Sequence, residues 1–300
     1  MTRPASARVG IIGLGVMGGA IARRLLASGT AVVGYDIDER RLEALAEAGA
    51  QRAGSARDVA QRCRVVLLLL PSDAALEAAA WGPQGLAEAA RRGLTVVEMS
   101  TLSIDAKEGL RDRLEPRGVA VLDCPVSGTG VQAETGDIVV YASGDEGAID
   151  ECFDVLAMIS RRVIRVGRFG AGSQMKYLAN LLVAIHVAAA AEVLALAIRA
   201  GFDPAFVVEA LIAGAGTSRM LEVRGPMMAA RRYRPASMAL RLFEKDLDII
   251  GAFAASHSAP VPVFATAVGL FKAASARGLG DLDTSVIHEL LLGPATDGAR

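Results

Sequence analysis

The chain has 300 residues, a length that fits two domains of about 150 residues each. Hydrophobic residues make up 52% and charged residues 22% of it, which excludes a disordered or low-complexity protein because there is ample apolar side chain to bury. Three cysteines are too few for a disulfide framework. The near balance of 32 basic and 33 acidic residues gives no indication of a nucleic acid or an anionic membrane as partner.

The first half of the sequence alternates short aliphatic runs with amphipathic stretches. Uninterrupted runs of Val, Ile and Leu are typical of strands that are buried on both faces of a parallel sheet. The strands that this pattern predicts are residues 9–12, 31–35, 65–70, 95–99, 119–122, 138–142 and 163–166. The helices that it predicts between them include residues 20–28, 39–48, 74–80 and 105–114. This repetition predicts a doubly wound α/β domain over residues 1–169.

The pattern changes near residue 170, where helical stretches take over. They cover residues 173–200, 204–213, 238–256 and 261–276. We therefore expect an all-helical domain over residues 170–300 that begins with a long interdomain helix. Residues 178–198 are almost all apolar and long enough to span a membrane. Asn180, His186 and Glu192 interrupt them and no aromatic belt flanks them, which favours a buried core helix. The N-terminus has no apolar signal region, so we expect a cytoplasmic protein without a membrane partner.

A glycine-rich turn lies between the first predicted strand and the helix after it. The pattern is G-x-G-x-x-G, and its residues are Gly13, Leu14, Gly15, Val16, Met17 and Gly18. The first glycine permits a tight turn, the second lets the backbone approach a pyrophosphate, and the third lets helix and strand pack closely. The helix N-terminus presents free N–H groups and the positive end of its dipole to an anion. A purely structural turn is the alternative, but the strand-to-helix context favours a Rossmann-type, dinucleotide-binding domain.

One acidic residue indicates which dinucleotide is bound. Asp36 lies at the end of the second predicted strand, where the ribose hydroxyls of NAD are expected. A carboxylate there accepts hydrogen bonds from the 2′-hydroxyl and repels the 2′-phosphate of NADP. Arg40 and Arg41 follow closely and keep NADP open as an alternative, because arginine pairs well with phosphate. The sequence predicts NAD as the preferred cofactor.

Four sequence blocks, in order along the chain, are similar to those of one enzyme family. They are GIIGLGVMG at residues 10–18, DCPVSG at 123–128, GAGSQMKYLAN at 170–180 and KDL at 245–247. On these blocks the chain resembles the β-hydroxyacid dehydrogenases, the group of 3-hydroxyisobutyrate dehydrogenase and tartronate semialdehyde reductase. Thr129 stands where the family usually has a second glycine, and Ala179 where it has the first of two asparagines. The first departure leaves the reaction type intact and puts the substrate in doubt.

The resemblance implies a hydride transfer between NAD(H) and a small 3-hydroxy acid or its semialdehyde. The three histidines and three cysteines lack metal-ligand spacing, so we expect no metal and an organic acid/base for the alcohol proton. Lys176 is the candidate, because a desolvated lysine can exchange a proton near neutral pH and its charged form stabilises an alkoxide. Asn180, four residues later on the same helical face, would hold the substrate oxygen or orient the ammonium. A lysine that only snorkels from a buried helix is the alternative.

Two further groups of residues are candidates for ligand contacts. The turn after the strand at 119–122 suits a substrate carboxylate, through a serine hydroxyl and backbone N–H groups that a glycine leaves open. Its predicted substrate-binding residues are Ser127, Gly128 and Thr129. By the resemblance alone, further cofactor contacts are implied for Leu70, Pro71, Thr101 and Lys245.

Two other functions are open alternatives. One is an imine reductase, which has the same two-domain architecture with the lysine replaced, and the other is a non-catalytic dinucleotide-binding module. Lys176 argues against the imine reductase, and Lys176, Asn180 and Ser127 together disfavour the binding module. The identity of the hydroxy acid and the direction of the reaction are left open. The resemblance also implies a 6-phosphogluconate dehydrogenase-like C-terminal domain and assembly into homodimers or homotetramers.

Overall fold

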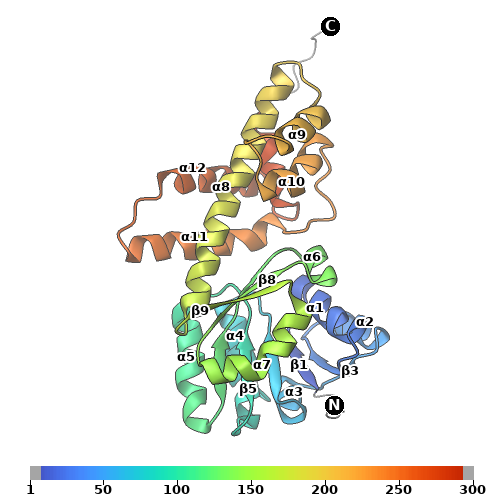
Figure 1. Ribbon diagram of the computed structural model, residues 1–300, viewed down its shortest axis with the longest axis vertical. Helices are drawn as coiled ribbons and strands as arrows, with labels where there is room; N and C mark the ends of the chain where they lie inside the picture. The colour runs from blue at the N-terminus through green and yellow to red at the C-terminus, as the bar shows by residue number, and fades with distance from the viewer. Residues whose placement is uncertain (1–7, 293–300) are drawn as a thin grey trace. The chain divides into compact units, whose positions relative to one another are not determined.

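The computed structural model describes residues 8–292, and the chain divides into two compact units between Lys176 and Tyr177 (Figure 1). The first unit holds a nine-stranded sheet, whereas the named elements of the second are all helices. The predicted fold class, a Rossmann-type α/β domain followed by an all-helical domain, is confirmed. The predicted absence of a signal region rests in part on residues 1–7, which lie outside the described residues.

The sheet follows the order β3-β2-β1-β4-β5-β6-β8-β7, and β9 pairs with β8. Its strands are β1 (Val9–Ile12), β2 (Val32–Tyr35), β3 (Gln51–Arg52), β4 (Val65–Leu68), β5 (Thr95–Glu98), β6 (Ala120–Asp123), β7 (Val126–Ser127), β8 (Val139–Ser143) and β9 (Arg162–Gly167). The strands from β3 to β6 are all parallel, so their carboxyl ends share one edge of the sheet. β8 runs antiparallel to both β6 and β7.

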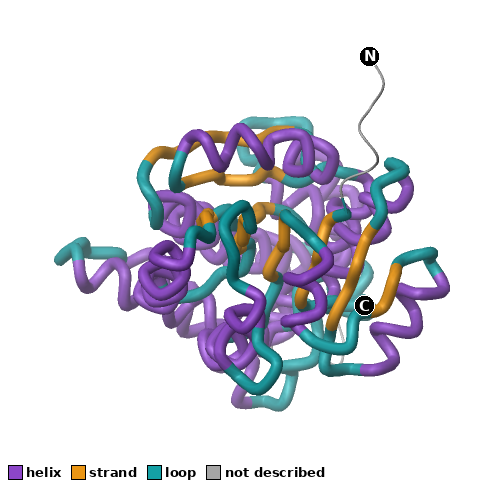
Figure 2. The backbone as a smooth tube through the Cα atoms, turned by 90° about the horizontal axis from the view of Figure 1, so that it is seen from below, coloured by secondary structure: helices purple, strands orange, loops and turns teal. Residues whose placement is uncertain are grey.

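Helices cover both faces of this sheet (Figures 1 and 2). They are α1 (Val16–Ala27), α2 (Glu39–Glu47), α3 (Ala56–Arg62), α4 (Asp73–Trp81), α5 (Ile104–Leu114), α6 (Gly130–Thr135) and α7 (Glu146–Ile159). Alternate strand residues point to opposite faces. Ile11 and Leu67 pack in one apolar cluster with α1 and α7, while Ile12 and Val66 pack in a second cluster with α3, α4 and α5. Short 3-10 turns lie at Leu86–Ala89 and Glu115–Arg117.

The second unit is built from helices. They are α8 (Ala171–Arg199), which begins in the first unit, α9 (Pro204–Ile212), α10 (Arg219–Ala229), α11 (Leu240–Ser256), α12 (Pro262–Ala276) and α13 (His288–Leu292), with a 3-10 turn at Thr284–Ile287. Its core includes Phe243 and Phe271, whose rings meet edge to face with centroids 5.5 Å apart. Asp203 caps α9 and Pro204 fills its first turn, as a helix start requires.

Helix α8 combines apolar length with partial burial. It is long and apolar enough, by length and composition, to cross a membrane, and 44% of its most apolar window is buried within the chain. Leu178, Leu182 and Leu196 are exposed at 51%, 52% and 68%. One face of α8 therefore packs in the core, and the opposite face is apolar and exposed.

Several elements differ from the sequence-based expectation. Strands β3 and β7 have two residues each, too few for a hydrophobic run, and helices α3, α6, α7 and α10 were not predicted. Pro226 inside α10 argues against a helix in any reading from sequence. The strand predicted at 138–142 exists as β8 but runs against β6, because an apolar run indicates burial without indicating direction.

Candidate active site

The glycine turn joins β1 to α1 in a conformation that two of its glycines make possible. Gly13 has a φ of +94°, and a Cβ there would lie 2.2 Å from the Leu69 carbonyl oxygen. A Cβ on Gly18 would lie 1.9 Å from the Gly13 carbonyl oxygen, so the third glycine lets α1 pack against the turn. A Cβ on Gly15, in contrast, would have only Arg41 Nη1 nearby, at 3.9 Å. Gly15 thus borders open space where an anion could approach.

The start of α1 suits an anion as well. Gly15 is the N-cap of this helix and supplies no side-chain hydrogen bond to its first turn. The first N–H groups of a helix carry a positive partial charge and need acceptors. A phosphate at this point would supply them, so the residues present fit the pyrophosphate of a dinucleotide.

Asp36 follows β2 and ties the glycine turn to that strand. Its Oδ2 accepts a hydrogen bond from Leu14 N at 2.6 Å, and its Oδ1 accepts one from Asp38 N at 2.8 Å. Arg41 Nη1 lies 3.3 Å from the same carboxylate. The negative charge of Asp36 favours a ribose hydroxyl at this point. The guanidinium of Arg41, in contrast, could bind a phosphate.

The other predicted cofactor residues of the first unit follow the carboxyl ends of neighbouring strands. Leu70 and Pro71 come after β4, and Thr101 comes after β5. Ser100 links the two segments, since its Oγ accepts a hydrogen bond from Leu70 N at 2.8 Å. Together with the glycine turn after β1, these segments line the carboxyl edge of the parallel strands, where α/β folds bind ligands.

The predicted substrate turn is formed by β7 and the start of α6. Gly128 has a φ of +148°, and a Cβ there would lie 2.6 Å from Ile138 Cγ2, so the turn needs glycine. Thr129 is the N-cap of α6 and forms a capping box with Gln132: the Thr129 Oγ1 accepts from Gln132 N at 3.4 Å, and Gln132 Oε1 accepts from Thr129 N at 3.0 Å. This capping role accounts for the presence of threonine at position 129. Substrate contact by Ser127, Gly128 and Thr129 stays a prediction.

Lys176 and Asn180 lie one helical turn apart on α8, and both are buried. Asn180 Nδ2 donates a hydrogen bond to Asp246 Oδ2 at 2.9 Å, which leaves the Asn180 Oδ1 as an acceptor. Lys245 Nζ lies 2.8 Å from the other oxygen of Asp246. Asp246 thus joins two predicted site residues, a role that the sequence analysis missed although the KDL block contains it.

A buried charge cluster beneath the strand ends was also missed. Lys107 on α5 is fully buried, with its Nζ 2.5 Å from Glu98 Oε2 and 2.8 Å from Asp123 Oδ1. It donates hydrogen bonds to the Ser100 carbonyl oxygen at 2.7 Å and to Asp123 Oδ1, while its contact with Glu98 is an ion pair. Burial lowers the pKa of Lys107, but the Asp123 and Glu98 carboxylates raise it by more, so the lysine is charged. Burial raises the pKa of Glu98, and the Lys107 charge opposes that shift in part.

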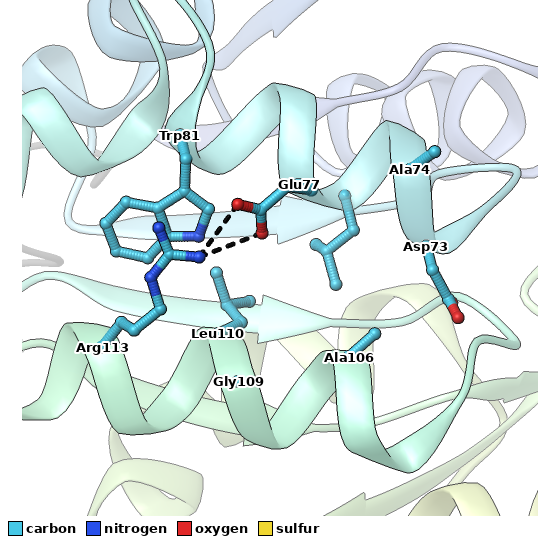
Figure 3. A pocket seen from close by; sticks show the side chains of 9 residues that line it. Asp73, Ala74, Glu77, Trp81, Ala106, Gly109, Leu110 and Arg113 are labelled. Carbon is cyan, nitrogen blue, oxygen red and sulfur yellow. Dashed lines mark hydrogen bonds and ion pairs between the residues drawn. The ribbon is translucent and has the colours of Figure 1, made fainter.

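A surface pocket lies away from these residues. Its volume is about 340 Å³, and it is formed between α4 and α5 (Figure 3). Arg113 crosses it, with its guanidinium 3.6 Å from the Trp81 ring centroid and 2.9 Å from the Glu77 carboxylate. None of the predicted site residues lines this pocket. Within residues 8–292, no group of three or more His, Cys, Asp or Glu side chains is arranged to hold a metal ion.

Comparison with known protein families matches both units. Residues 8–167 match the family described as the NAD binding domain of 6-phosphogluconate dehydrogenase. Residues 170–291 match the family described as NAD-binding of NADP-dependent 3-hydroxyisobutyrate dehydrogenase.

Individual relatives match over nearly the whole chain. The chain is 36% identical to L-threonate dehydrogenase of Cupriavidus necator, over 96% of this chain and 97% of that protein. It is 31% identical to 2-hydroxy-3-oxopropionate reductase of Escherichia coli, over 95% and 97%. Among solved structures, 3-hydroxyisobutyrate dehydrogenase of Salmonella typhimurium superimposes with a TM-score of 0.87 at 33% identity, covering 95% of this chain and 100% of that one.

Proposed function

Because the chain belongs to the 3-hydroxyacid dehydrogenase family of NAD(P)-dependent oxidoreductases, we propose that it transfers a hydride between NAD(H) and a small 3-hydroxy acid or its semialdehyde. We propose Lys176 as the general acid/base. The observation that carries this assignment is the burial of Lys176, 7% exposed on α8, one turn before an asparagine whose amide is oriented by Asp246.

The cofactor would be held by the glycine turn and Asp36. The open space beside Gly15 and the first turn of α1 suit the pyrophosphate, and Asp36 suits the adenosine ribose. The negative charge of Asp36 favours NAD over NADP, while Arg41 beside it would favour the phosphate. The ratio of kcat/KM for the two cofactors tests this preference, and a tenfold or greater preference for NADPH contradicts it.

Proton transfer falls to the chain's own residues, and the bound nicotinamide supplies the hydride acceptor or donor. In the direction of oxidation, neutral Lys176 accepts the proton of the substrate hydroxyl as the carbon loses its hydride. In the direction of reduction, the Lys176 ammonium stabilises the developing alkoxide and then gives it the proton. Asn180 Nδ2 donates to Asp246, which orients the amide, and Asn180 Oδ1 is an acceptor that could orient the ammonium or the substrate hydroxyl.

The substrate carboxylate is assigned to the turn after β6. The Ser127 hydroxyl and the backbone N–H groups beside Gly128 are suitable donors for it. The names of the relatives define the compounds to test first: L-threonate, 3-hydroxyisobutyrate and 2-hydroxy-3-oxopropionate. A spectrophotometric screen that includes cyclic imines separates the alternatives. Activity on hydroxy acids supports the proposal, turnover of imines alone favours an imine reductase, and no turnover favours a binding module.

The decisive variants replace Lys176. We expect Lys176→Ala to lower kcat by ~10²–10⁴, the range for loss of an acid/base, with the Kd for NAD within about threefold. Lys176→Arg should be nearly as inactive, because arginine keeps the charge but cannot exchange a proton near neutral pH. Lys272→Ala is the matched control, since Lys272 is 60% exposed on α12. If Lys176→Ala keeps more than about a tenth of the wild-type kcat, another group moves the proton.

We also propose a homodimer or homotetramer assembled through the second unit. The support is the exposed apolar face of α8, where Leu178, Leu182 and Leu196 lie open to solvent. Light scattering at micromolar concentration tests this, and a monomer mass contradicts it. A cytoplasmic location stays a prediction from the sequence.

A further inference from the structure

The first turn of α8 is capped by side chains from two strands. Gly170, which precedes the helix with a φ of +90°, has no side chain that could cap it. Instead, Gly172 N donates to Ser143 Oγ at 3.0 Å, and Ser173 N donates to Asp123 Oδ2 at 2.8 Å. The hydroxyl of Ser173 also donates to Asp123 Oδ1, at 2.8 Å. Two of the helix's four orphan N–H groups are therefore satisfied by the ends of β6 and β8.

The two capping residues are fixed to each other. Asp123 and Ser143 are partners in the antiparallel pairing of β6 with β8. The Ser143 hydroxyl donates to the Asp123 carbonyl oxygen at 2.9 Å, so its lone pairs face Gly172 N. A Cβ on Gly172 would lie 2.6 Å from the carbonyl oxygens of both Asp123 and Tyr141. The helix backbone thus lies directly against the two strands at Gly172.

Lys107 holds the Asp123 carboxylate in its capping position. Its ammonium contacts Asp123 Oδ1 at 2.8 Å in a site that is fully buried. The Asp123 carboxylate therefore forms an ion pair with Lys107 and accepts two hydrogen bonds from α8. A buried carboxylate with these partners has one favourable orientation, because any other leaves a charge or a donor unsatisfied.

The capped turn is the one that leads to Lys176. Ser173 precedes Lys176 by three residues, which is one helical turn and a rise of about 4.5 Å. The direction in which Lys176 leaves the helix is consequently set by the rotation of that turn. Since proton transfer needs the donor and acceptor held in a defined geometry, a displacement of about 1 Å can cost ~10²-fold in rate.

We propose that Asp123 and Ser143, with Lys107 behind them, are positioning residues that fix the rotation of α8 and thereby the direction of the Lys176 side chain. This inference rests on the proposed acid/base role of Lys176. It gives a role to three residues that are not among the predicted cofactor-binding or substrate-binding residues.

Ser143→Ala tests the inference with the smallest change. It removes one hydroxyl, no charge and no volume of consequence. Ser160→Ala is the matched control, because Ser160, the C-cap of α7, is a buried serine of the same unit whose Oγ donates to the Leu156 carbonyl oxygen at 2.7 Å. We expect Ser143→Ala to lower kcat by about tenfold or more, with KM and the Kd for NAD within about threefold. We expect Ser160→Ala to leave kcat within twofold.

Hydrogen exchange supplies a readout that is independent of activity. In Ser143→Ala, the amide of Gly172 loses its acceptor, so exchange in a peptide covering residues 170–176 should be faster, and in Ser160→Ala unchanged. If Ser143→Ala does not fold, Ser173→Ala, which removes only the side-chain bond to Asp123, is measured in its place. Unchanged exchange, or a kcat within twofold of the wild type, overturns the inference.

A double-mutant cycle with Lys176→Ala separates positioning from general damage. If Ser143 acts through Lys176, the Ser143→Ala substitution has little further effect once Lys176 is alanine, so the two effects are not additive. Additive effects overturn the inference. A fully active Lys176→Ala refutes the proposed function and the inference together, whereas an inactive Lys176→Ala with a normal Ser143→Ala refutes the inference alone.

Discussion

Replacement of Lys107 by methionine would remove a cation that contacts two buried carboxylates. Lys107 Nζ lies 2.5 Å from Glu98 Oε2 and 2.8 Å from Asp123 Oδ1, and all three side chains are fully buried. Methionine has a similar length and fills the space, so the change is in charge and hydrogen bonding rather than in packing. Two carboxylates would be left facing each other in a site without solvent.

The expected cost follows from that geometry. Removal of one partner of a buried ion pair typically destabilises a protein by about 3–5 kcal/mol, because the remaining charge is uncompensated. The Ser100 carbonyl oxygen loses its donor as well, which adds to the loss. We therefore expect Lys107→Met to reduce the free energy of unfolding of the first unit by about 3–5 kcal/mol at pH 8.

The loss should depend on pH. In the wild type, burial raises the pKa of Glu98, and the positive charge of Lys107 partly offsets this increase. Without Lys107 the folded variant holds a proton on this carboxyl at pH values where the unfolded chain has lost it. A carboxyl whose pKa is raised on folding destabilises the folded state increasingly as the pH rises above the unfolded pKa. The difference between variant and wild type should consequently be smaller at pH 5 than at pH 8.

The single tryptophan of the chain provides the assay. Trp81 lies on α4 in the first unit, beneath the Arg113 guanidinium (Figure 3), so its fluorescence in a urea titration follows that unit. Lys272→Met is the matched control, because the Lys272–Asp248 pair is exposed and worth at most about 1 kcal/mol. A Lys107→Met variant as stable at pH 8 as Lys272→Met, or one whose loss is largest at pH 5, would refute the reasoning.

Two further outcomes are expected. Gly15→Val should weaken NAD binding at least tenfold, or about 1.4 kcal/mol, in calorimetry, because the valine side chain enters the open space beside α1. Gly54→Val, which also places a side chain in open space, should leave NAD binding unchanged. Unchanged affinity for Gly15→Val would mean that the turn does not hold the cofactor. Burial raises the pKa of Cys63 to about 11 and that of Cys152 to about 12, and it also raises the pKa of Cys124. A disulfide reagent at pH 8 should therefore titrate three thiols only after denaturation. A thiol that reacts within seconds in the native protein would contradict this.

The features that could be predicted from the sequence are local. The glycine turn and Asp36 are separated by one strand and one helix, so hydrophobic periodicity alone puts both at the carboxyl edge of the sheet. The spacing of Lys176 and Asn180 likewise needs only a helix. Thr129 carried a local signal that was not used, since a threonine followed three residues later by glutamine is a capping-box pattern.

The features that could not be predicted depend on chain segments that meet only in three dimensions. Glu98, Lys107 and Asp123 lie on three different elements, and a lysine in an amphipathic helix normally faces solvent. One trace of its burial is in the sequence: Lys107 shares the apolar stripe of α5 with Leu110 and Leu114. The contact of Asp246 with Asn180 spans 66 residues and has no such trace.

The capping of α8 by upstream strands has a consequence for the order in which the chain is made. Asp123 precedes Ser173 by 50 residues, so on a ribosome both strand ends exist before the helix emerges. The partner of Asn180 is Asp246, which follows 66 residues later. At the ~5–20 residues per second of translation, that interval lasts roughly 3 to 13 seconds. The turn of α8 that carries Lys176 can thus form against strands that have already been synthesised. The turn that carries Asn180, four residues later, forms its bond to Asp246 only after Asp246 has been synthesised.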